Sequence, residues 1–465
     1  MKSIWKSEVE LPKRPTLSGN LKVQNVVIGA GMAGILTAWF LQRKGQEVIV
    51  VEADRIAGGQ TGNTTAKITS QHGLFYDRMI RLVGRKQARL YAEANEQAIH
   101  LFEKIIKAEN ISCQFEKKPA FLYTVSEDGI EKLRKEIKAA RSLGIDAVWI
   151  DSDRMNMASD DEKVRQIKEL PFAIKVAVCF PNQAQFHPLE FIAHLAKELV
   201  TYEHTKVLSV KKNIVYTQKG QIEADHIIFA THYPITNVPG FYFLRQHQER
   251  SYVLALADQE QLSGMYYGID KGALSLRSAG DFLLLGGGGH RTGKCKCKQK
   301  KNELFGYSFL RKQAKLYYPD ADIACEWSAQ DCMPHDDIPF IGKYSVFRQN
   351  WYVATGFKKW GMTSSMIAAQ IISNHICQTT EIEKNIFRPQ RILFLAGIKN
   401  FLIDVWESVA GLLKGLFAPK ERRCRHMGCM LDWNPEESTW ECSCHGTGYY
   451  DDGRLKDNPA QMNLK

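Results

Sequence analysis

The alternation of apolar and polar positions near the N-terminus predicts a strand, a helix and a second strand in succession. Residues 21–28, LKVQNVVI, form a short run rich in Val and Ile, and from Ile35 onward apolar residues recur at helical spacing. A second run, EVIVVE, ends at Glu52. This order completes a βαβ unit.

The turn of this unit carries three glycines. Gly29 allows a tight turn, Gly31 has no Cβ to obstruct a pyrophosphate, and Gly34 lets helix and strand pack closely. Glu52, about twenty residues further on, is suited to accept a hydrogen bond from a ribose 2′-hydroxyl, which argues against a 2′-phosphate. Because strand, helix and acid are all in register, we favour dinucleotide binding over a coincidental glycine-rich turn.

Other segments show both periodicities. Between Leu74 and Gly144 the pattern is largely helical, whereas AFLYTV, SYVLAL and GALSLRSAGDFLLLGG are typical of strands. The last of these predicts a hairpin whose turn is Ser278-Ala279-Gly280-Asp281.

A long helix is predicted over residues 394–417, FLAGIKNFLIDVWESVAGLLKGLF. Charged residues, Asp404 and Glu407 among them, interrupt its apolar positions too often for a bilayer span. We interpret residues 386–418 as an amphipathic connecting helix that packs against the rest of the chain. Contact with a membrane interface is the alternative.

The composition is that of a soluble globular protein, and 465 residues suffice for two or three domains. The N-terminus has no apolar h-region, so we expect a cytoplasmic protein. The 11 cysteines indicate reduced thiols and no disulfide framework. A net charge of +11 is not that of a dedicated nucleic-acid binder, and no nucleic-acid partner is expected. KCKCKQKK, Lys294 to Lys301, is interpreted as a solvated loop, or else as a dock for an acidic partner or anionic lipid.

Two Cys/His pairs lie close to the C-terminus, Cys424-x-His426 and Cys442-x-x-His445. A Rieske [2Fe–2S] centre needs two such pairs, because one iron binds two thiolates and the other binds two imidazoles. A tetrahedral zinc site also accepts two Cys and two His. A small core without metal is the third alternative.

The segment CxHxGC…CxCHG resembles the Rieske motif at every ligand position. The resemblance places Cys429 and Cys444 where Rieske proteins of respiratory complexes join the two cluster loops by a disulfide. Rieske modules usually have more β-rich sequence before the first loop, whereas here a helix is followed almost directly by Cys424. We therefore interpret residues 419–465 as a shortened Rieske module that leans on the rest of the chain.

Three further segments resemble FAD-dependent oxidoreductases of the D-amino-acid oxidase and glycine oxidase superfamily: GGQTGNTTAKITSQHG, ADHIIFATHYPI and GFKKWGMT. In that family the N-terminal βαβ unit binds the ADP half, a middle strand and loop contact the adenine, and the late element closes over the isoalloxazine. The resemblance implies these FAD contacts: Gly29, Gly31, Gly34, Glu52, Thr64, Thr65, Ala66, Lys67, Val207, Ala230, Gly356, Trp360, Gly361, Met362 and Thr363.

The resemblance also implies an α/β fold. A doubly wound FAD/NAD(P)-binding domain would interleave with an antiparallel α+β substrate domain, and a small β module of Rieske type would follow the connecting helix. The oxidoreductase would span residues 20–385, with an FAD part at 20–111, 181–239 and 336–385 and a substrate part at 112–180 and 240–335.

The substrate is less clearly indicated. Glycine-oxidase-like members have an arginine that pairs with the substrate carboxylate, but EWSAQDCMPHDDIPFIG has Asp331 and Cys332 at the matching position. Because an acid cannot hold a carboxylate, a cationic amine is at least as plausible a substrate as an α-amino acid. Arg250, Arg277 and Asp331 are the candidate substrate contacts, with a structural role as the alternative for both arginines.

The two modules together resemble a bacterial family of FAD-dependent oxidoreductases with an iron–sulfur tail. This implies a dehydrogenase that oxidises a C–N bond of a small amine or amino acid and passes electrons from FAD through the cluster to an external acceptor, a ferredoxin-like carrier or a quinone. The alternatives are reversed electron flow and a redox sensor without turnover. His72, His232 and His290 are interpreted as structural, and no catalytic residue is assigned. We expect a cytoplasmic location, or a peripheral one at the inner face of the membrane.

Overall fold

The structure is a computed structural model that describes residues 2–151, 162–294, 304–379, 386–391 and 394–464. Most of KCKCKQKK, from Cys295 onward, lies outside these ranges. The main helices are α1 (Ile4–Glu8), α2 (Met32–Arg43), α3 (Tyr76–Ala108), α4 (Glu127–Ser142), α6 (Glu162–Ile167), α7 (Pro188–Leu195), α8 (Gly306–Tyr317), α9 (Gly361–Ile376) and α10 (Phe394–Phe417). Short 3₁₀ turns occur at η1 (Gln60–Asn63), η2 (Tyr242–Leu244) and η5 (Lys420–Arg422).

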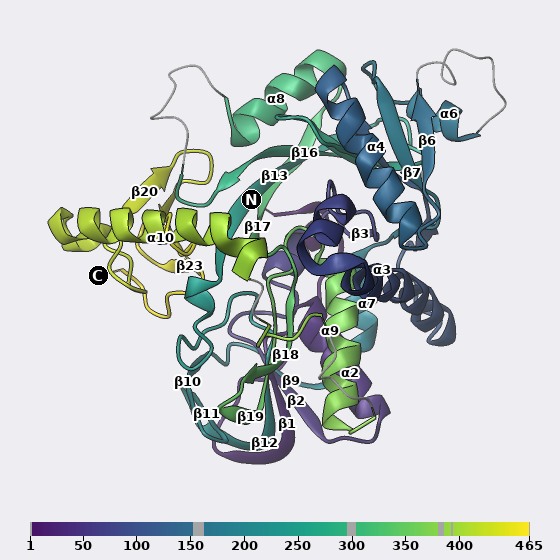
Figure 1. Cartoon of the computed structure of the whole chain (residues 1–465). Coiled ribbons are helices and arrows are strands. Elements are labelled where there is room, and N and C mark those ends of the chain that lie inside the picture. The colour runs from purple at the N-terminus through teal and green to yellow at the C-terminus, as the bar shows by residue number, and fades with distance from the viewer. Residues whose placement is uncertain (1, 152–161, 295–303, 380–385, 392–393, 465) are drawn as a thin grey trace.

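The first large sheet contains β1 (Leu21–Ile28), β2 (Val48–Val51), β9 (Val200–Tyr202), β10 (Val207–Lys211), β11 (Ile214–Thr217), β12 (Gln221–Phe229), β18 (Phe340–Ser345) and β19 (Arg348–Thr355). Strand β1 pairs in parallel with β2 and β12, and β12 pairs in parallel with β19, so the predicted βαβ unit is confirmed. All four residues of β2 are buried, as expected for a strand inside a parallel sheet. Figure 1 shows α2 and α9 side by side next to this sheet.

The second large sheet contains β5 (Ala120–Thr124), β6 (Val148–Asp151), β7 (Val176–Phe180), β13 (Gln246–Ala257), β14 (Met265–Gly268), β15 (Ser275–Ala279), β16 (Phe282–Arg291) and β17 (Ile323–Pro334). All its pairings are antiparallel except that of β14 with β5. Mixed sheets of this kind, next to a doubly wound sheet, agree with the predicted fold class. The bounds assigned to the FAD and substrate parts stay predictions.

The predicted hairpin of β15 and β16 is present, but its turn lies one residue later than expected. Ala279 pairs with Phe282, so Gly280 and Asp281 form a two-residue loop. Ser278 pairs with Leu283 and therefore belongs to the strand. Gly280 has a positive φ of 53°, which a two-residue loop commonly requires.

Two small sheets complete the molecule. Strands β3 (Lys67–Ile68), β4 (Glu116–Lys117) and β8 (Ala184–Gln185) form one, and β20 (Leu431–Asn434), β21 (Thr439–Cys442), β22 (Gly448–Tyr450) and β23 (Leu455–Asp457) form the other. In Figure 1 the yellow-green α10 lies across this C-terminal module. No helix within the described ranges is both long and apolar enough to cross a bilayer.

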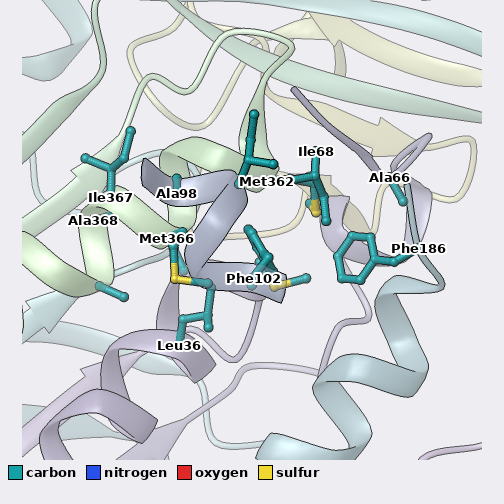
Figure 2. Packing of buried hydrophobic residues seen from close by; sticks show 14 of the residues in the cluster. Leu36, Ala66, Ile68, Ala98, Phe102, Phe186, Met362, Met366, Ile367 and Ala368 are labelled. Atoms are coloured by element: carbon teal, nitrogen blue, oxygen red, sulfur yellow. The ribbon is translucent and has the colours of Figure 1, made fainter. Parts of the chain in front are cut away.

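The main core joins the helices that carry the predicted FAD elements. Leu36 of α2, Phe102 of α3 and Met366 of α9 are fully buried, and Figure 2 shows them close together. Met362, one turn earlier in α9, lies in the same cluster as Ile68 of β3. This packing holds the first turn of α9 against β3, and both elements border the cavity described below.

Candidate functional site

A cavity of about 1470 Å³ opens where the two large sheets meet. Its walls contain most of the residues predicted to contact FAD: Gly29, Gly31, Glu52, Thr64, Thr65, Lys67, Val207, Ala230, Trp360, Gly361 and Met362. The structure thus brings together segments that lie more than three hundred residues apart. Four predicted contacts do not line the cavity: Gly34, Ala66, Gly356 and Thr363. The role of all these residues as FAD contacts stays a prediction.

The nucleotide end of the cavity is shaped by backbone. Gly29 has a φ of 106°, and a Cβ there would lie 2.5 Å from the Ala230 carbonyl oxygen. Gly31 is the N-cap of α2, so the free N–H groups and the positive dipole end of this helix face the cavity at that point. Both features fit a pyrophosphate, which needs close backbone approach and donors.

Glu52 is fixed at the end of β2. Its Oε2 accepts a hydrogen bond from the Ala30 N–H at 2.8 Å, and its Oε1 accepts one from the Asp54 N–H at 2.9 Å. Burial raises the pKa of this carboxyl, whereas the backbone N–H groups oppose the shift. The side chain lines the cavity, so its remaining acceptor capacity suits a ribose hydroxyl.

Arg277 lies behind the loop that contains Thr65 and Ala66. Its Nη1 donates to the carbonyl oxygens of these two residues at 2.8 and 2.9 Å, and the side chain is 2% exposed. Burial lowers the pKa of Arg277 to about 9. Because its guanidinium supports the loop from outside the cavity, we assign Arg277 to positioning and not to substrate binding.

His72 and Trp360 both line the cavity and stack, with ring centroids 4.7 Å apart and an interplanar angle of 15°. The two ring nitrogens of His72 are engaged by the Tyr91 hydroxyl and the Thr69 carbonyl oxygen, both at 2.8 Å. Burial lowers the pKa of His72 to about 3, so the ring is neutral. These contacts agree with the structural role predicted for this histidine.

An acid–base cluster lines the cavity beside β13 and β17. Lys359 Nζ lies 3.1 Å from Glu249 Oε2, and each stabilises the charge of the other. Asp331 faces the same cavity, and burial raises its pKa to about 7, against the opposing effect of Lys359. Asp331 is therefore the predicted substrate contact that the structure leaves available to a ligand.

Arg250 faces the C-terminal module. Its guanidinium lies 2.8 Å from Glu441 Oε1, 2.9 Å from Asp457 Oδ2 and 3.8 Å from Glu437 Oε2. The side chain is 2% exposed, and three acids from one module surround a cation from another. Although Arg250 also borders the cavity, its charge is already neutralised, so we assign it to the interface and not to a substrate carboxylate.

The Cys/His pairs occupy two similar loops of the C-terminal module. The first Cys/His loop (424–430) closes with a hydrogen bond from Gly428 N–H to the Cys424 carbonyl at 2.8 Å. The second (442–447) closes with one from Gly446 N–H to the Cys442 carbonyl at 2.9 Å. Both glycines have a φ of 85°, so the two turns have the same backbone form.

The two histidines meet between these loops. The rings of His426 and His445 are perpendicular, with centroids 4.9 Å apart. The Nδ1 atoms of both are buried and have no hydrogen-bond partner among the described residues. Burial lowers the pKa of His426 to about 4 and that of His445 to about 3, which keeps both imidazoles neutral. Two neutral, unpartnered imidazole nitrogens are what a metal ligand requires.

The four cysteines of these loops are also buried and close together. A hydrogen bond with Cys442 lowers the pKa of Cys424 to about 7. The Sγ atoms of Cys429, Cys442 and Cys444 lie within 4.8 Å of one another. Cys429 and Cys444 are free thiols in the structure, and the disulfide between them stays a prediction.

Both Cys/His loops depend on the rest of the chain. Gln248 Nε2 donates to the His445 carbonyl at 2.7 Å, and Gln330 Nε2 donates to the Gly446 carbonyl at 2.7 Å and to Gln248 Oε1 at 2.8 Å. The second loop is also bound by Arg291, whose Nε donates to the Ser443 carbonyl at 2.9 Å. Strands β13, β16 and β17 of the second large sheet thus hold the second Cys/His loop.

The first Cys/His loop is held by α10. The Met430 N–H donates to the Gly411 carbonyl at 3.0 Å, and a Cβ at Gly415 would lie 2.1 Å from the Gly428 carbonyl oxygen. His426 Nε2 contacts Asn237 Oδ1 at 2.9 Å, from the loop that precedes η2. Helix α10 and the loop before η2 thus both contact the first Cys/His loop.

The comparisons with known proteins fit these two sites. The family described as FAD dependent oxidoreductase (DAO) matches residues 25–375. The chain belongs to this family. The Rieske [2Fe-2S] domain family matches residues 401–465, a range that includes most of α10, and the predicted start of the module at residue 419 stays a prediction. FAD and a [2Fe–2S] cluster are the cofactors that these families imply, and this match decides against the zinc alternative.

Relatives of this DAO-family protein combine the same parts or share its fold. The Rieske 2Fe-2S iron-sulfur protein YhfW of Bacillus subtilis (strain 168) is 33% identical over 99% of this chain and 96% of its own. L-proline dehydrogenase from P. horikoshii has a TM-score of 0.66 at 17% identity, covering 81% of this chain and 98% of that one. Glycine oxidase from Geobacillus kaustophilus has a TM-score of 0.65 at 15% identity, covering 80% and 99%. The two solved structures establish the fold.

Sequence reasoning missed the residues that join the oxidoreductase to its Rieske domain. Gln248, Gln330 and Arg291 do this, and Asp404 of α10 receives a hydrogen bond from Arg291. In β13 the side chains of Gln246, Gln248 and Arg250 are buried and alternate with less buried neighbours. All six residues from 246 to 251 are polar, so the sequence does not show which of them face inward, and it gave no signal for this interface.

Proposed function

We propose that this chain is a flavin-dependent dehydrogenase that oxidises a C–N bond of a small amine or amino acid and passes the electrons through its Rieske domain to an external one-electron acceptor. The observation that carries the proposal is the direct bonding of the second Cys/His loop to strands of the cavity wall. Gln248 borders the cavity and also donates to the carbonyl of His445. A fixed, buried contact of this kind suits electron transfer within one molecule.

Each cofactor would be held by its own set of residues. Gly29, Gly31 and Glu52 would bind the ADP half of FAD, and the stacked pair His72 and Trp360 would border its ring. Cys424, His426, Cys442 and His445 would bind the cluster. When bound, the flavin accepts two electrons as hydride, whereas a Rieske cluster carries one electron at a time at about −150 to +300 mV.

Asp331 would receive the amine. Above about pH 7 its side chain is a carboxylate that lines the cavity, and it would pair with an ammonium group of the substrate. The ion pair of Lys359 with Glu249 would lie beside this amine site. Arg250 and Arg277 have protein partners, so among the described residues neither would contribute a free guanidinium for a carboxylate.

The overall reaction balances as follows. The amine loses two electrons and two protons, one proton from carbon within the hydride and one from nitrogen, and becomes an imine that water then hydrolyses. The two electrons leave singly to two equivalents of the acceptor, and the protons pass to solvent. By their names, the solved relatives act on L-proline and glycine, which have the same type of bond.

Anaerobic titration with a panel of small amines, without dithionite, tests the proposal. An active amine should bleach the flavin absorbance and then produce the EPR signal of a reduced Rieske cluster. Steady turnover with a one-electron acceptor separates an enzyme from a redox sensor, which would not sustain it. Flavin reduction by a reduced one-electron carrier, in the absence of any amine, would support reversed electron flow instead.

A cysteine variant sharpens this test. Cys442→Ser should leave flavin bleaching by the amine intact but abolish reduction of the one-electron acceptor. Cys377→Ser, a half-buried cysteine at the end of α9, is the matched control and should retain both reactions. Loss of neither reaction in Cys442→Ser would contradict the route through the Rieske domain.

A further inference from the structure

Helix α10 presents two opposite faces. Its inward face carries Gly397, Asp404, Gly411 and Gly415, spaced so that all four contact the body of the molecule. A Cβ at Gly397 would lie 3.0 Å from the His335 Cβ, and one at Gly411 would lie 2.5 Å from the Cys444 Sγ. The glycines therefore let this helix approach both domains closely.

The outward face of α10 is apolar and uncovered. Trp406 is 70% exposed, Leu416 67%, Leu402 60% and Phe417 89%. Further apolar residues along α10 are exposed: Ile398, Ile403, Val409, Leu412 and Leu413. Phe401, although 38% exposed, packs against His335 on the inward side, with ring centroids 5.8 Å apart. Leu402, Trp406, Val409, Leu413 and Leu416 recur every three or four residues, so they form one continuous stripe. Soluble monomers rarely expose an apolar patch of this extent without a binding role.

Charge divides between the two faces in a systematic way. Both acids of α10 turn inward: Asp404 contacts His247 Nδ1 at 3.0 Å, His335 Nε2 at 2.5 Å and Arg291, and Glu407 lies 2.5 Å from Lys294 Nζ. The exposed positions at and after the C-terminal end of the helix are mainly cationic: Lys414, Lys420, Arg422 and Arg425, with Glu421 as the acid among them.

A second exposed apolar site lies close to α10. η2 contacts α10, its N-cap Phe241 is 44% exposed, and its last residue Leu244 is 47% exposed. The exposed surface thus combines a long apolar stripe with a group of cations at one end. A soluble protein partner would need an equally long apolar groove, whereas an anionic bilayer supplies both the apolar interior and the negative charge.

We propose that α10 docks this protein on the surface of an anionic lipid bilayer. The stripe from Leu402 to Leu416 would enter the region between headgroups and acyl chains, and the cations that follow would contact lipid phosphates. The first Cys/His loop packs on the inward face of α10, so the Rieske domain would lie about one helix diameter, ~10 Å, from the bilayer. Delivery of electrons to an acceptor within the membrane follows only if the proposed function also holds.

Co-sedimentation of the full chain with lipid vesicles tests docking without any turnover. The protein should bind vesicles containing phosphatidylglycerol, bind pure phosphatidylcholine vesicles less tightly, and dissociate partly at high salt. Trp406→Ser combined with Leu413→Ser should lower binding at least tenfold. Phe347→Ser replaces an aromatic residue that is 76% exposed on the turn between β18 and β19, and it should bind like the wild type.

Charge variants separate the two components of binding. Lys420→Glu with Arg422→Glu should weaken binding to anionic vesicles about tenfold or more and leave binding to neutral vesicles unchanged. Lys86→Glu with Lys104→Glu, two exposed cations of α3, is the matched control with the same change of charge. Retained flavin and cluster absorbance would show that each variant is folded.

Two results would overturn the proposal. One is wild-type protein that stays in the supernatant with phosphatidylglycerol vesicles. The other is a dimer in sedimentation analysis that dissociates when Trp406 and Leu413 are replaced, because a second copy of the chain would then cover the stripe. Neither result depends on electron transfer, so docking and the proposed function can fail independently.

Discussion

The nucleotide end of the cavity and the interface with the Rieske domain are built in contrasting ways. At the nucleotide end, contiguous backbone shapes the site: Gly29 and Gly31 allow close approach, and one helix supplies its dipole. At the interface, side chains that are distant in sequence form the contact: Arg250 pairs with Glu441 and Asp457, which lie about two hundred residues further along the chain. A site made of backbone tolerates side-chain changes, whereas a buried charge cluster depends on each member.

Removal of Arg250 should have the largest effect. Arg250→Leu leaves Glu441 and Asp457 without their cation, whereas Glu437 keeps Lys456 at 2.6 Å, and we expect a loss of about 3–5 kcal/mol in the free energy of unfolding. Urea unfolding followed by cluster absorbance measures this loss. Arg311→Leu is the control, because its pair with Glu326 is half exposed and contributes about 0–1 kcal/mol. Equal losses of unfolding free energy in Arg250→Leu and Arg311→Leu would show that the interface does not depend on its buried charge cluster.

Two glycines with the same φ isolate the contact between the domains. Gly446→Ala should cost about 2–3 kcal/mol, because a Cβ there would lie 2.5 Å from the Gln248 Cβ in addition to the strain of a φ of 85°. Gly428→Ala has the same φ but nothing within 4 Å, and it should cost about 1 kcal/mol. Thermal unfolding compares the two variants. A larger loss of stability for Gly428→Ala would show that backbone strain, and not the contact between the two domains, determines the cost of these substitutions.

Asp331 should determine how amine oxidation depends on pH. Since burial raises its pKa to about 7, the group is neutral below this pH and a carboxylate above it, so kcat/KM should rise as the pH passes through about 7. Asp331→Asn should raise the KM for the amine roughly thirtyfold, which corresponds to a loss of about 2 kcal/mol of binding free energy. It should also abolish the increase of kcat/KM with pH. Asp331→Glu should restore it in part. An unchanged profile in Asp331→Asn would place the amine elsewhere.

Glu52→Gln should have the smallest effect. The amide keeps one oxygen acceptor but loses one of the bonds from Ala30 and Asp54, and the glycines and helix dipole are untouched. We expect the Kd for FAD to rise about fivefold, equivalent to about 1 kcal/mol. Ultrafiltration of the flavin from diluted protein measures it. Complete loss of FAD would mean that the nucleotide end depends on this side chain as strongly as the interface depends on Arg250.

Local patterns predicted the elements that consist of local sequence. The βαβ unit, the helical region after Leu74 and the hairpin of β15 and β16 follow from apolar spacing and turn residues, and the structure contains all three. The hairpin turn was one residue off, because pairing of Ser278 with Leu283 extends the ladder and spacing alone cannot show this. The Cys/His spacing likewise indicated the Rieske domain, since the predicted ligands lie within two short loops.

The sequence by itself therefore determined the βαβ unit, the Rieske domain and the family, because each rests on neighbouring residues whose spacing has a direct chemical meaning. Only the tertiary structure decided which groups surround Arg250, Arg277 and Asp331. Two of these three residues have protein partners far away in the chain, while Asp331 faces the cavity. The physical reason is that a buried charge takes its role from whichever group the fold places beside it, and that neighbour cannot be read from local spacing.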